Sequence, residues 1–448
     1  MKLPPVFAGL PRALRILPLS AGLVLSVLPF EASGQRLSEL YSAALSGNPN
    51  LKMREFDIER ARAESDGVRS RLLPQVSALG SWSYNDYRDA LVGDQRYAGD
   101  RANISLRQAL YDPVSSRRLS GALATIQQRE HDAELTRLAL LEAVVDCFVL
   151  ALGAQDELAW LDAETQAAGR QVDRLRAMRE RQMAKVTDLA EADAYAQTLV
   201  TRTIDARNQY AVALTRLSEL CGIDVRQVPA MSRTAFDRVA GTQKEWMANA
   251  QRNYPRLLAL VEALDAARRS VEASRAEYLP QLAASLSHTY SNQGYDNRRQ
   301  PKYHVTSAGV EIRAPIYEGG RPGASVRGAA ARHGVAEQQL ESARREVDRE
   351  TTTIWLSSQA NHARISSTNA EVLALEQTVK AQEIGLDLGV SRITDLLDAR
   401  RRLLKARVDQ AKARYDYLRD IVALRIRTGD VTETDVALWD GWFGPIGR

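Results

Sequence analysis

Hydrophobic and polar residues alternate one by one in four short stretches of the chain. In residues 76–84, apolar side chains at every second position are separated by serines, and residues 102–107, 282–290 and 307–313 alternate in the same way. A period of two is typical of a strand with one apolar and one polar face. The sequence therefore predicts four strands, in two pairs. The aromatic residues near the strand ends are Tyr84, Tyr87, Tyr290 and Tyr295.

These four strands fit two architectures. An apolar outer face flanked by aromatic residues is typical of a membrane β-barrel, but each strand signal is weak, and a soluble hairpin with one buried face has the same pattern. Four strands cannot close a barrel, since about eight are needed. Three chains would supply twelve strands; two or four chains would also close a barrel.

Very long helical stretches surround the strands. Helices are predicted over residues 37–71 and 243–278, before the first strand of each pair. Longer ones follow over residues 114–182 and 321–386, each turning back into a return helix that ends near Gly222 or Gly429. About seventy helical residues span roughly 100 Å. Two apolar stripes are predicted to be buried: Leu138, Leu141, Val145, Phe148 and Leu152, and the coiled-coil seam Leu404, Val408, Ala411, Tyr415, Leu418 and Val422.

The chain repeats this plan. Pro49 and Pro255 lie 206 residues apart, as do the Leu-Pro-Gln segments at 73–75 and 279–281, while Thr187 and Thr394 lie 207 apart. A duplicated half-protein explains these matches. The predicted division is a signal peptide at 1–34, a first repeat at 35–222, a linker at 223–242, a second repeat at 243–429 and a tail at 430–448.

The N-terminal segment has the features of a secretory signal peptide. A basic start is followed by an apolar run and by small residues at 32–34, although an N-terminal membrane anchor is an alternative. The whole chain of 448 residues has a net charge of only +4 with both signs intermixed, which argues against a nucleic-acid partner. The signal peptide predicts that the chain is exported. The exported chain would be soluble in the periplasm, secreted or inserted in the outer membrane as a barrel.

The second turn carries a specific motif. Residues 388–399 read L-G-V-S-R-I-T-D-L-L-D-A, which resembles a helical hairpin tip of the TolC family of outer-membrane efflux and secretion proteins, and Val-Thr-Asp-Leu at 186–189 resembles the other tip. The resemblance covers roughly residues 37–430. It implies an α+β membrane protein in which three chains form a twelve-stranded barrel and a periplasmic helical tunnel.

The resemblance also implies partners and a function. Such a protein would be the outer-membrane exit duct of a tripartite efflux or type I secretion system. It would work with a periplasmic adaptor and an inner-membrane transporter of the ABC or RND type, and contact outer-membrane lipid. Drugs and secreted proteins both remain open as cargo. The alternatives are a periplasmic coiled-coil scaffold without a pore and a stand-alone cation-selective channel.

Two aspartates are the first candidate site. Asp395 and Asp398 lie three residues apart near a helix start, so they share a face. In a trimer they would form two acidic rings at the periplasmic mouth. Capping of the helix end is the alternative, and the resemblance favours the rings.

The tips supply two further candidate sets. By resemblance, Thr187 and Asp188 would hold the mouth closed, with Arg392 as a rewired partner, because Leu386 and Ser391 replace the family's tyrosine and arginine. Thr187 as a plain N-cap is the alternative. Adaptor docking is expected at Gln182, Lys185, Gly389 and Ser391; Gln182 stands where the family has glycine, so the first tip is expected to dock differently.

The remaining chemistry is sparse. No histidine has metal-ligand spacing and no nucleophile motif occurs, so no catalytic, cofactor-binding or metal site is expected, and no enzyme. Gly319-Gly320 is interpreted as a bend between strand and helix. Cys147 and Cys221 lie at similar heights on antiparallel helices, so a disulfide is conceivable in an oxidising compartment, but two free thiols are favoured.

Overall fold

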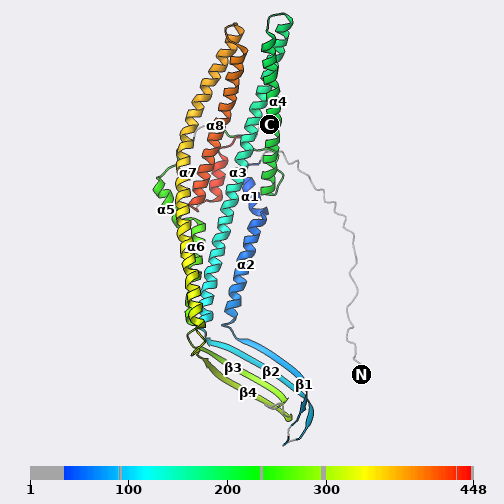
Figure 1. The fold of residues 1–448 in the computed structure, drawn as a ribbon, viewed down its shortest axis with the longest axis vertical. Helices are drawn as coiled ribbons and strands as arrows, with labels where there is room; N and C mark the ends of the chain where they lie inside the picture. The colour runs from blue at the N-terminus through cyan, green and yellow to red at the C-terminus, as the bar shows by residue number, and fades with distance from the viewer. Residues whose placement is uncertain are drawn as a thin grey trace, which may run out of the picture. The chain divides into compact units, whose positions relative to one another are not determined.

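A computed structural model describes residues 35–88, 90, 93–232, 236–293, 299–429 and 431–444. The predicted signal peptide lies outside the described residues. The first half contains α1 (Leu37–Gly47), α2 (Pro49–Ser70), β1 (Gln75–Tyr87), β2 (Gln95–Tyr111), α3 (Pro113–Glu180) and α4 (Val186–Cys221). The second half contains α5 (Gln243–Asn253), α6 (Pro255–Ala276), β3 (Gln281–Gln293), β4 (Arg299–Arg313), α7 (Arg321–Asp387) and α8 (Ile393–Arg427), followed by α9 (Glu433–Asp440). The same order of elements thus occurs twice (Figure 1).

The helices before the strands are each broken by a proline. The sequence predicted single helices over 37–71 and 243–278, and this was wrong. Asn48 and Tyr254 have extended backbones, with ψ of 120° and 121°, and a proline opens the next helix in both cases. Proline disfavours the helical conformation of the residue before it and has no N–H to continue the hydrogen-bond ladder.

The two longest helices have nearly the predicted bounds. Helix α3 has 68 residues and α7 has 67, which corresponds to roughly 100 Å each. The return helices α4 and α8 end at Gly222 and beside Gly429, whose φ angles of 69° and 67° are left-handed, as predicted for helix stops. Gly319 and Gly320 also have positive φ and turn the chain into α7.

The four strands form one antiparallel sheet in the order β1-β2-β3-β4. The register sets Leu106 opposite both Val76 and Leu286, which places the apolar positions of successive strands on one face. Among the described residues, the extensive contacts of each strand are with other strands, and Figure 1 shows no helix over the sheet. In a single chain, β1 and β4 are therefore the edges, and both faces are uncovered. Tyr295 lies outside the described residues.

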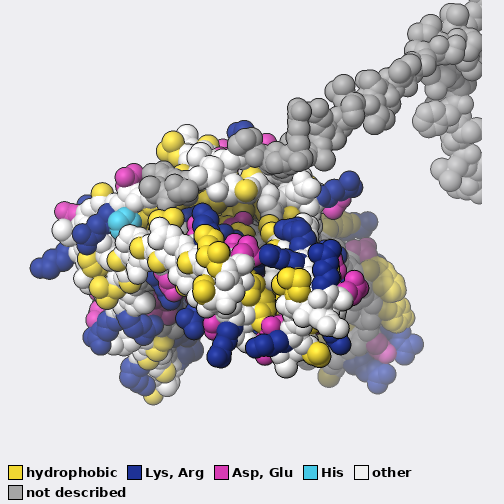
Figure 2. Space-filling view, turned by 90° about the horizontal axis from the view of Figure 1, so that it is seen from above, with side chains coloured by type: hydrophobic (Ala, Val, Ile, Leu, Met, Phe, Trp, Pro, Cys, Tyr) yellow, Lys and Arg dark blue, Asp and Glu magenta, His cyan; other side chains and the backbone are white. Residues whose placement is uncertain are grey.

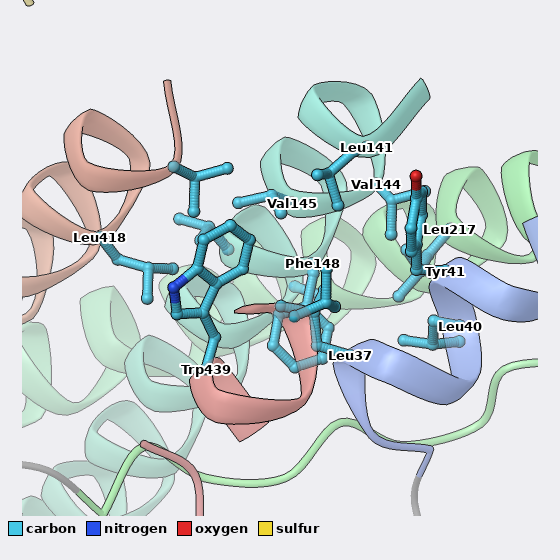
Figure 3. Packing of buried hydrophobic residues seen from close by; sticks show 14 of the residues in the cluster. Leu37, Leu40, Tyr41, Leu141, Val144, Val145, Phe148, Leu217, Leu418 and Trp439 are labelled. Carbon is cyan, nitrogen blue, oxygen red and sulfur yellow. The ribbon is translucent and has the colours of Figure 1, made fainter. Parts of the chain in front are cut away.

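A central cluster of buried side chains joins both halves of the chain. It gathers residues from α1, α3, α4, α8 and α9 around Phe148, which is fully buried (Figure 3). All five residues of the predicted stripe on α3 are buried, as are five of the six in the seam on α8, with Val408 partly buried. The segment predicted as a C-terminal tail contains α9, whose Trp439 packs into this cluster.

The two cysteines lie at this level and are free, as favoured by the sequence. Cys221 is buried, and this burial raises the pKa of its thiol to about 12, so the reactive thiolate is disfavoured. Within the described ranges, none of the helices combines the length and the apolar composition that a membrane crossing would require.

Candidate functional site: the tips of the two helical hairpins

The first hairpin (α3 and α4) and the second hairpin (α7 and α8) turn with the same hydrogen-bond pattern. In the first, the N–H groups of Gln182 and Met183 donate to the carbonyls of Arg179 and Met178, at 2.8 Å each. In the second, Gly389 and Val390 donate to Leu386 and Gly385, at 3.1 and 2.8 Å. Both are Schellman motifs, which satisfy the last carbonyls of a helix through one left-handed residue.

The left-handed residue differs between the tips. Gly389 has a φ of 74°, while Gln182 has a φ of 61° and is the one non-glycine residue with positive φ among those the structure describes. A side chain in this conformation costs about 1–2 kcal/mol, because Cβ approaches the following carbonyl. Gln182 therefore has the same left-handed backbone as Gly389 and adds an exposed side chain.

Large apolar side chains stand exposed at both tips. The exposed fractions are 68% for Met183, 61% for Val186, 72% for Leu388 and 80% for Val390. The predicted docking residues Gln182, Lys185 and Gly389 are exposed beside them, and Ser391 is half-buried. Figure 2, seen from the tip end, shows basic side chains interleaved with acidic ones over this surface.

The two candidate aspartates lie on the exposed side of the first turns of α8. The carboxylate of Asp395 accepts the backbone N–H of Arg392 at 3.3 Å, so in the single chain it caps the helix, which was the alternative interpretation. Asp398 forms an ion pair with Arg401 at 2.9 Å, with both side chains more than half exposed. Both carboxylates remain accessible, and the acidic rings stay a prediction because they require further copies of the chain.

The predicted gating residues are not brought together within one chain. Lys185, not Thr187, is the N-cap of α4, so the plain N-cap interpretation of Thr187 is wrong. The Thr187 hydroxyl instead lies 3.4 Å from a carboxylate oxygen of Asp188. Arg392 is exposed and, in the part of the chain that is described, forms no ion pair with Asp188. Their predicted role between neighbouring hairpins stays a prediction.

Other residues join the hairpins below the tips. The guanidinium of Arg400 on α8 contacts Glu164 on α3 at 3.4 Å and Glu383 on α7 at 2.7 Å. Tyr195 on α4 donates its hydroxyl to the same Glu164 at 3.1 Å, and burial together with this carboxylate raises the pKa of Tyr195. Arg400 is only 13% exposed, so one largely buried cation connects all four helices. We call these four residues the Arg400 node.

A second link lies closer to the tips. Arg174 on α3 and Asp387 at the end of α7 form an ion pair at 2.7 Å, with both side chains about half exposed. Leu386 beside it packs onto the apolar core of the hairpins. Near the tips the hairpins are thus joined by Arg174 and Arg400 rather than by groups at positions 386 and 391, and Arg419 on α8 pairs with Asp146 on α3 further from the tips.

Sequence reasoning missed these links, since their partners are far apart in the chain. It also missed Gly385, which is buried where an added Cβ would collide with the Ser391 hydroxyl. Its position in the sequence could have identified it, because Gly385 lies four residues before the left-handed Gly389, on the inner side of the turn.

Comparison with known proteins identifies the family. The sequence model of the outer membrane efflux protein family matches residues 40–223 and again residues 246–430. The chain belongs to this family. These are outer-membrane channel proteins, and the expected resemblance to TolC is confirmed.

Several relatives are similar over nearly their whole length. The outer membrane protein TolC of Vibrio cholerae is 26% identical over 94% of this chain and 97% of its own, and TolC of Escherichia coli is 28% identical over 94% and 88%. The alkaline protease secretion protein AprF of Pseudomonas aeruginosa is 26% identical over 93% and 89%.

Solved structures share the fold. The outer-membrane channel OprN aligns with a TM-score of 0.79 at 20% identity, over 88% of this chain and 90% of that one. The CmeC outer membrane channel of Campylobacter jejuni aligns with a TM-score of 0.79 at 16% identity, over 96% and 97%. The predicted α+β channel fold is confirmed.

Proposed function

We propose that this chain is one subunit of a trimeric exit duct in the outer membrane, serving a tripartite efflux or type I secretion system. Family membership and relatives such as AprF support an export role. The duct is passive: this chain supplies a path and a gate, and the inner-membrane transporter drives the transport. No catalysis by this chain is part of the proposal.

The observation that carries the proposal is the uncovered four-stranded sheet. One of its faces is apolar and exposed, with Val76, Trp82 and Ile312 each about 70% accessible. The unpaired backbone groups of β1 and β4 need partners. Three copies would pair β4 of one chain with β1 of the next, and the resulting twelve-stranded barrel would bury the apolar face in lipid.

The helices then have a defined place. A length of roughly 100 Å is about three times the apolar thickness of a bilayer, so α3 and α7 must project into the periplasm. The tips form the mouth of the duct, where Asp395 and Asp398 would be repeated three times around the axis. Rings of carboxylates favour cations.

The tips also suit an adaptor. Exposed Met183, Val186, Leu388 and Val390 would be covered by a partner, since apolar patches of this kind mark protein contacts. We propose a periplasmic adaptor at this surface and an ABC or RND-type transporter beyond it. Opening requires that the hairpins separate, so the Arg400 node and the Arg174–Asp387 pair would have to break or slide.

The testing experiment is reconstitution of detergent-extracted protein into planar bilayers. We expect a small, cation-selective conductance for the wild type. In Asp395→Ala/Asp398→Ala we expect the conductance to persist and the cation selectivity to fall, because the carboxylates at the mouth are gone. Thr432→Ala, which removes a helix cap on α9 far from the mouth, is the control for general damage.

The outcomes separate the candidate functions. A protein that is extracted without detergent and never conducts would support the scaffold instead. A fully open channel that needs no second protein for export would support the stand-alone channel. Conductance with selectivity unchanged by the double substitution would keep the duct and remove Asp395 and Asp398 from its mouth.

A further inference from the structure

The face of the sheet opposite the apolar one carries a ladder of hydroxyl and amide groups. Side chains of adjacent strands meet across the sheet at 2.8–2.9 Å. The pairs are Ser77 with Ser105, Asn103 with Thr289, and Ser287 with Ser307. Groups of this kind prefer water, so this polar face is built for an aqueous environment.

Arginines rise from the same polar face on two of the four strands. The register sets Arg107 opposite Ser285, Arg101 opposite Ser291 and Arg313 opposite Gln281, all on the polar side. Arg299 lies opposite Gln293 at the far end of β4. Gln281 and Ser291, which face Arg313 and Arg101 across β3, are ten residues apart. The arginines therefore extend over about 33 Å along the strands.

Little negative charge balances these arginines. Among the described strand residues of the polar face, Glu311 is the single acidic one, and it lies 3.5 Å from Arg107 with both side chains more than half exposed. An exposed pair of this kind is weak. Within the described strands, the polar face thus presents four guanidinium groups against one carboxylate and no other charged side chain.

We propose that the arginine-bearing polar face is an anion-attracting wall inside the barrel, which receives the carboxylate groups and other anionic groups of the cargo. This inference rests on the proposed function, because the polar face lines the lumen only if the apolar face meets lipid. In three copies, twelve arginines would surround one water-filled path. Positive side chains lining a pore favour anions, and low-dielectric walls strengthen their field.

The duct would then carry opposite charge at its two ends. Asp395 and Asp398 make the periplasmic mouth acidic, and the wall of Arg101, Arg107, Arg299 and Arg313 makes the exit basic. A cargo segment of either sign would meet one attractive and one repulsive zone. Neither zone alone would set the ion selectivity of the whole path. In the wild type, the narrower mouth would dominate the measured selectivity and mask the effect of the wall.

The test therefore starts from the mouth variant Asp395→Ala/Asp398→Ala. Its reversal potential is measured in a potassium chloride gradient near 0.1 M, where the Debye length is about 10 Å and charges on the wall are felt. We expect this variant to favour chloride. Adding Arg101→Gln, Arg107→Gln and Arg313→Gln is expected to lower the chloride-to-potassium permeability ratio by on the order of twofold or more.

Two matched variants isolate the effect. Arg96→Gln removes one arginine from the same strand β2, but on the other face, where it pairs with Asp86 at 3.4 Å, and it is expected to leave the ratio unchanged. Glu311→Gln adds net positive charge to the wall and is expected to raise the ratio. This second variant tests the wall even if the triple arginine variant does not assemble.

The failure modes are distinct. A conducting protein whose reversal potential ignores both Glu311→Gln and the arginine substitutions would overturn the charged wall and leave the duct intact. A correctly extracted protein that never conducts in any variant would overturn the duct itself, and the wall with it.

Discussion

The two helical hairpins have the same backbone plan and are held together by different interactions. Positions 207 residues apart are buried in both, yet Val144, Ala151 and Leu161 on α3 correspond to Thr351, Ser358 and Thr368 on α7. The interior of the first hairpin is therefore mainly apolar, while the second buries hydroxyl groups at the same places.

The ion pairs within the two hairpins also differ. In the first hairpin, Arg207–Asp162 and Arg176–Asp193 join α4 and α3 at 3.7 and 3.9 Å. Those of the second hairpin are shorter. The pairs Arg400–Glu383 and Arg407–Glu376 cross from α8 to α7 at 2.7 and 2.9 Å and are seven residues apart on each helix. One heptad further on, Arg414 donates to Asn369 at 3.3 Å. Such a heptad-spaced ladder is typical of the flanking positions of a coiled coil.

This difference teaches that duplication preserved the geometry and let its energetic basis diverge. Apolar burial is not weakened by charge screening, whereas ion pairs at partly exposed positions weaken as salt screens them. We expect the second hairpin to be the less stable of the two and to respond more to ionic strength and pH.

The largest effect is expected for the apolar interior. Leu161 is 2% exposed, so Leu161→Ala should destabilise the first hairpin by about 2–5 kcal/mol through lost burial and a cavity. Hydrogen exchange of α4 amides measures this local stability. At the matched position, Thr368→Ala should cost about 1 kcal/mol, because the hydroxyl donates to carbonyls of its own helix, those of Arg364 and Ile365. Equal costs at both positions would refute the contrast.

A smaller effect is expected at the Arg400 node. Arg400→Gln leaves Glu164 and Glu383 without their cation and should cost about 1–3 kcal/mol, measured by thermal unfolding in detergent. Arg345→Gln on α7 is the control, since its pair with Glu341 is exposed and should contribute under about 1 kcal/mol. A closed-state conductance that is unchanged in Arg400→Gln would show that the Arg400 node does not help to hold the mouth closed.

The tips should differ by about 1 kcal/mol. Gln182→Gly relieves the left-handed side chain and should stabilise the first tip by about that amount, reduced by the greater freedom of glycine in the unfolded chain. Gly389→Gln should destabilise the second tip by a similar amount. Thermal midpoints moving in the same direction for both variants would show that backbone strain does not set tip stability.

The smallest effect concerns pH. Burial raises the pKa of Asp420, which accepts a hydrogen bond from Asn361 at 2.8 Å between α8 and α7. An acid with a raised folded-state pKa contributes stability below its unfolded pKa of about 3.9, and loses it as pH rises through the folded value. Asp420→Asn should therefore stabilise the second hairpin slightly at neutral pH. Unfolding measured from pH 4 to 7 should show a flatter profile; an unchanged profile contradicts the prediction.

Much of the fold could be predicted from the sequence because local signals set it. Alternation gave the strands, and glycines such as Gly222 and Gly429 marked the helix ends. The breaks before Pro49 and Pro255 were missed although the signal was present, since a proline disfavours the helical conformation of the residue before it. The left-handed backbone of Gln182 could not be anticipated from its residue type, since glutamine disfavours a positive φ. The turn of the hairpin requires that φ at this position.

The site was predicted less completely. The aspartates and tip residues were located because they lie within one short motif. The links between hairpins were not, because Arg400 and Glu164 are 236 residues apart and meet only after four helices have packed. Contacts between copies, including the acidic rings, depend on surfaces built from several separate segments of the chain. A pattern within one segment describes only part of such a surface.

The two open edges of the sheet also have a genetic consequence. Because β1 and β4 each lack a neighbour in one chain, a ring of three closes only if every copy offers both edges intact. A subunit with one spoiled edge would be incorporated through its sound edge and leave a gap. In a cell that makes equal amounts of sound and spoiled chains, random mixing would leave about one ring in eight complete, so such an allele would be dominant.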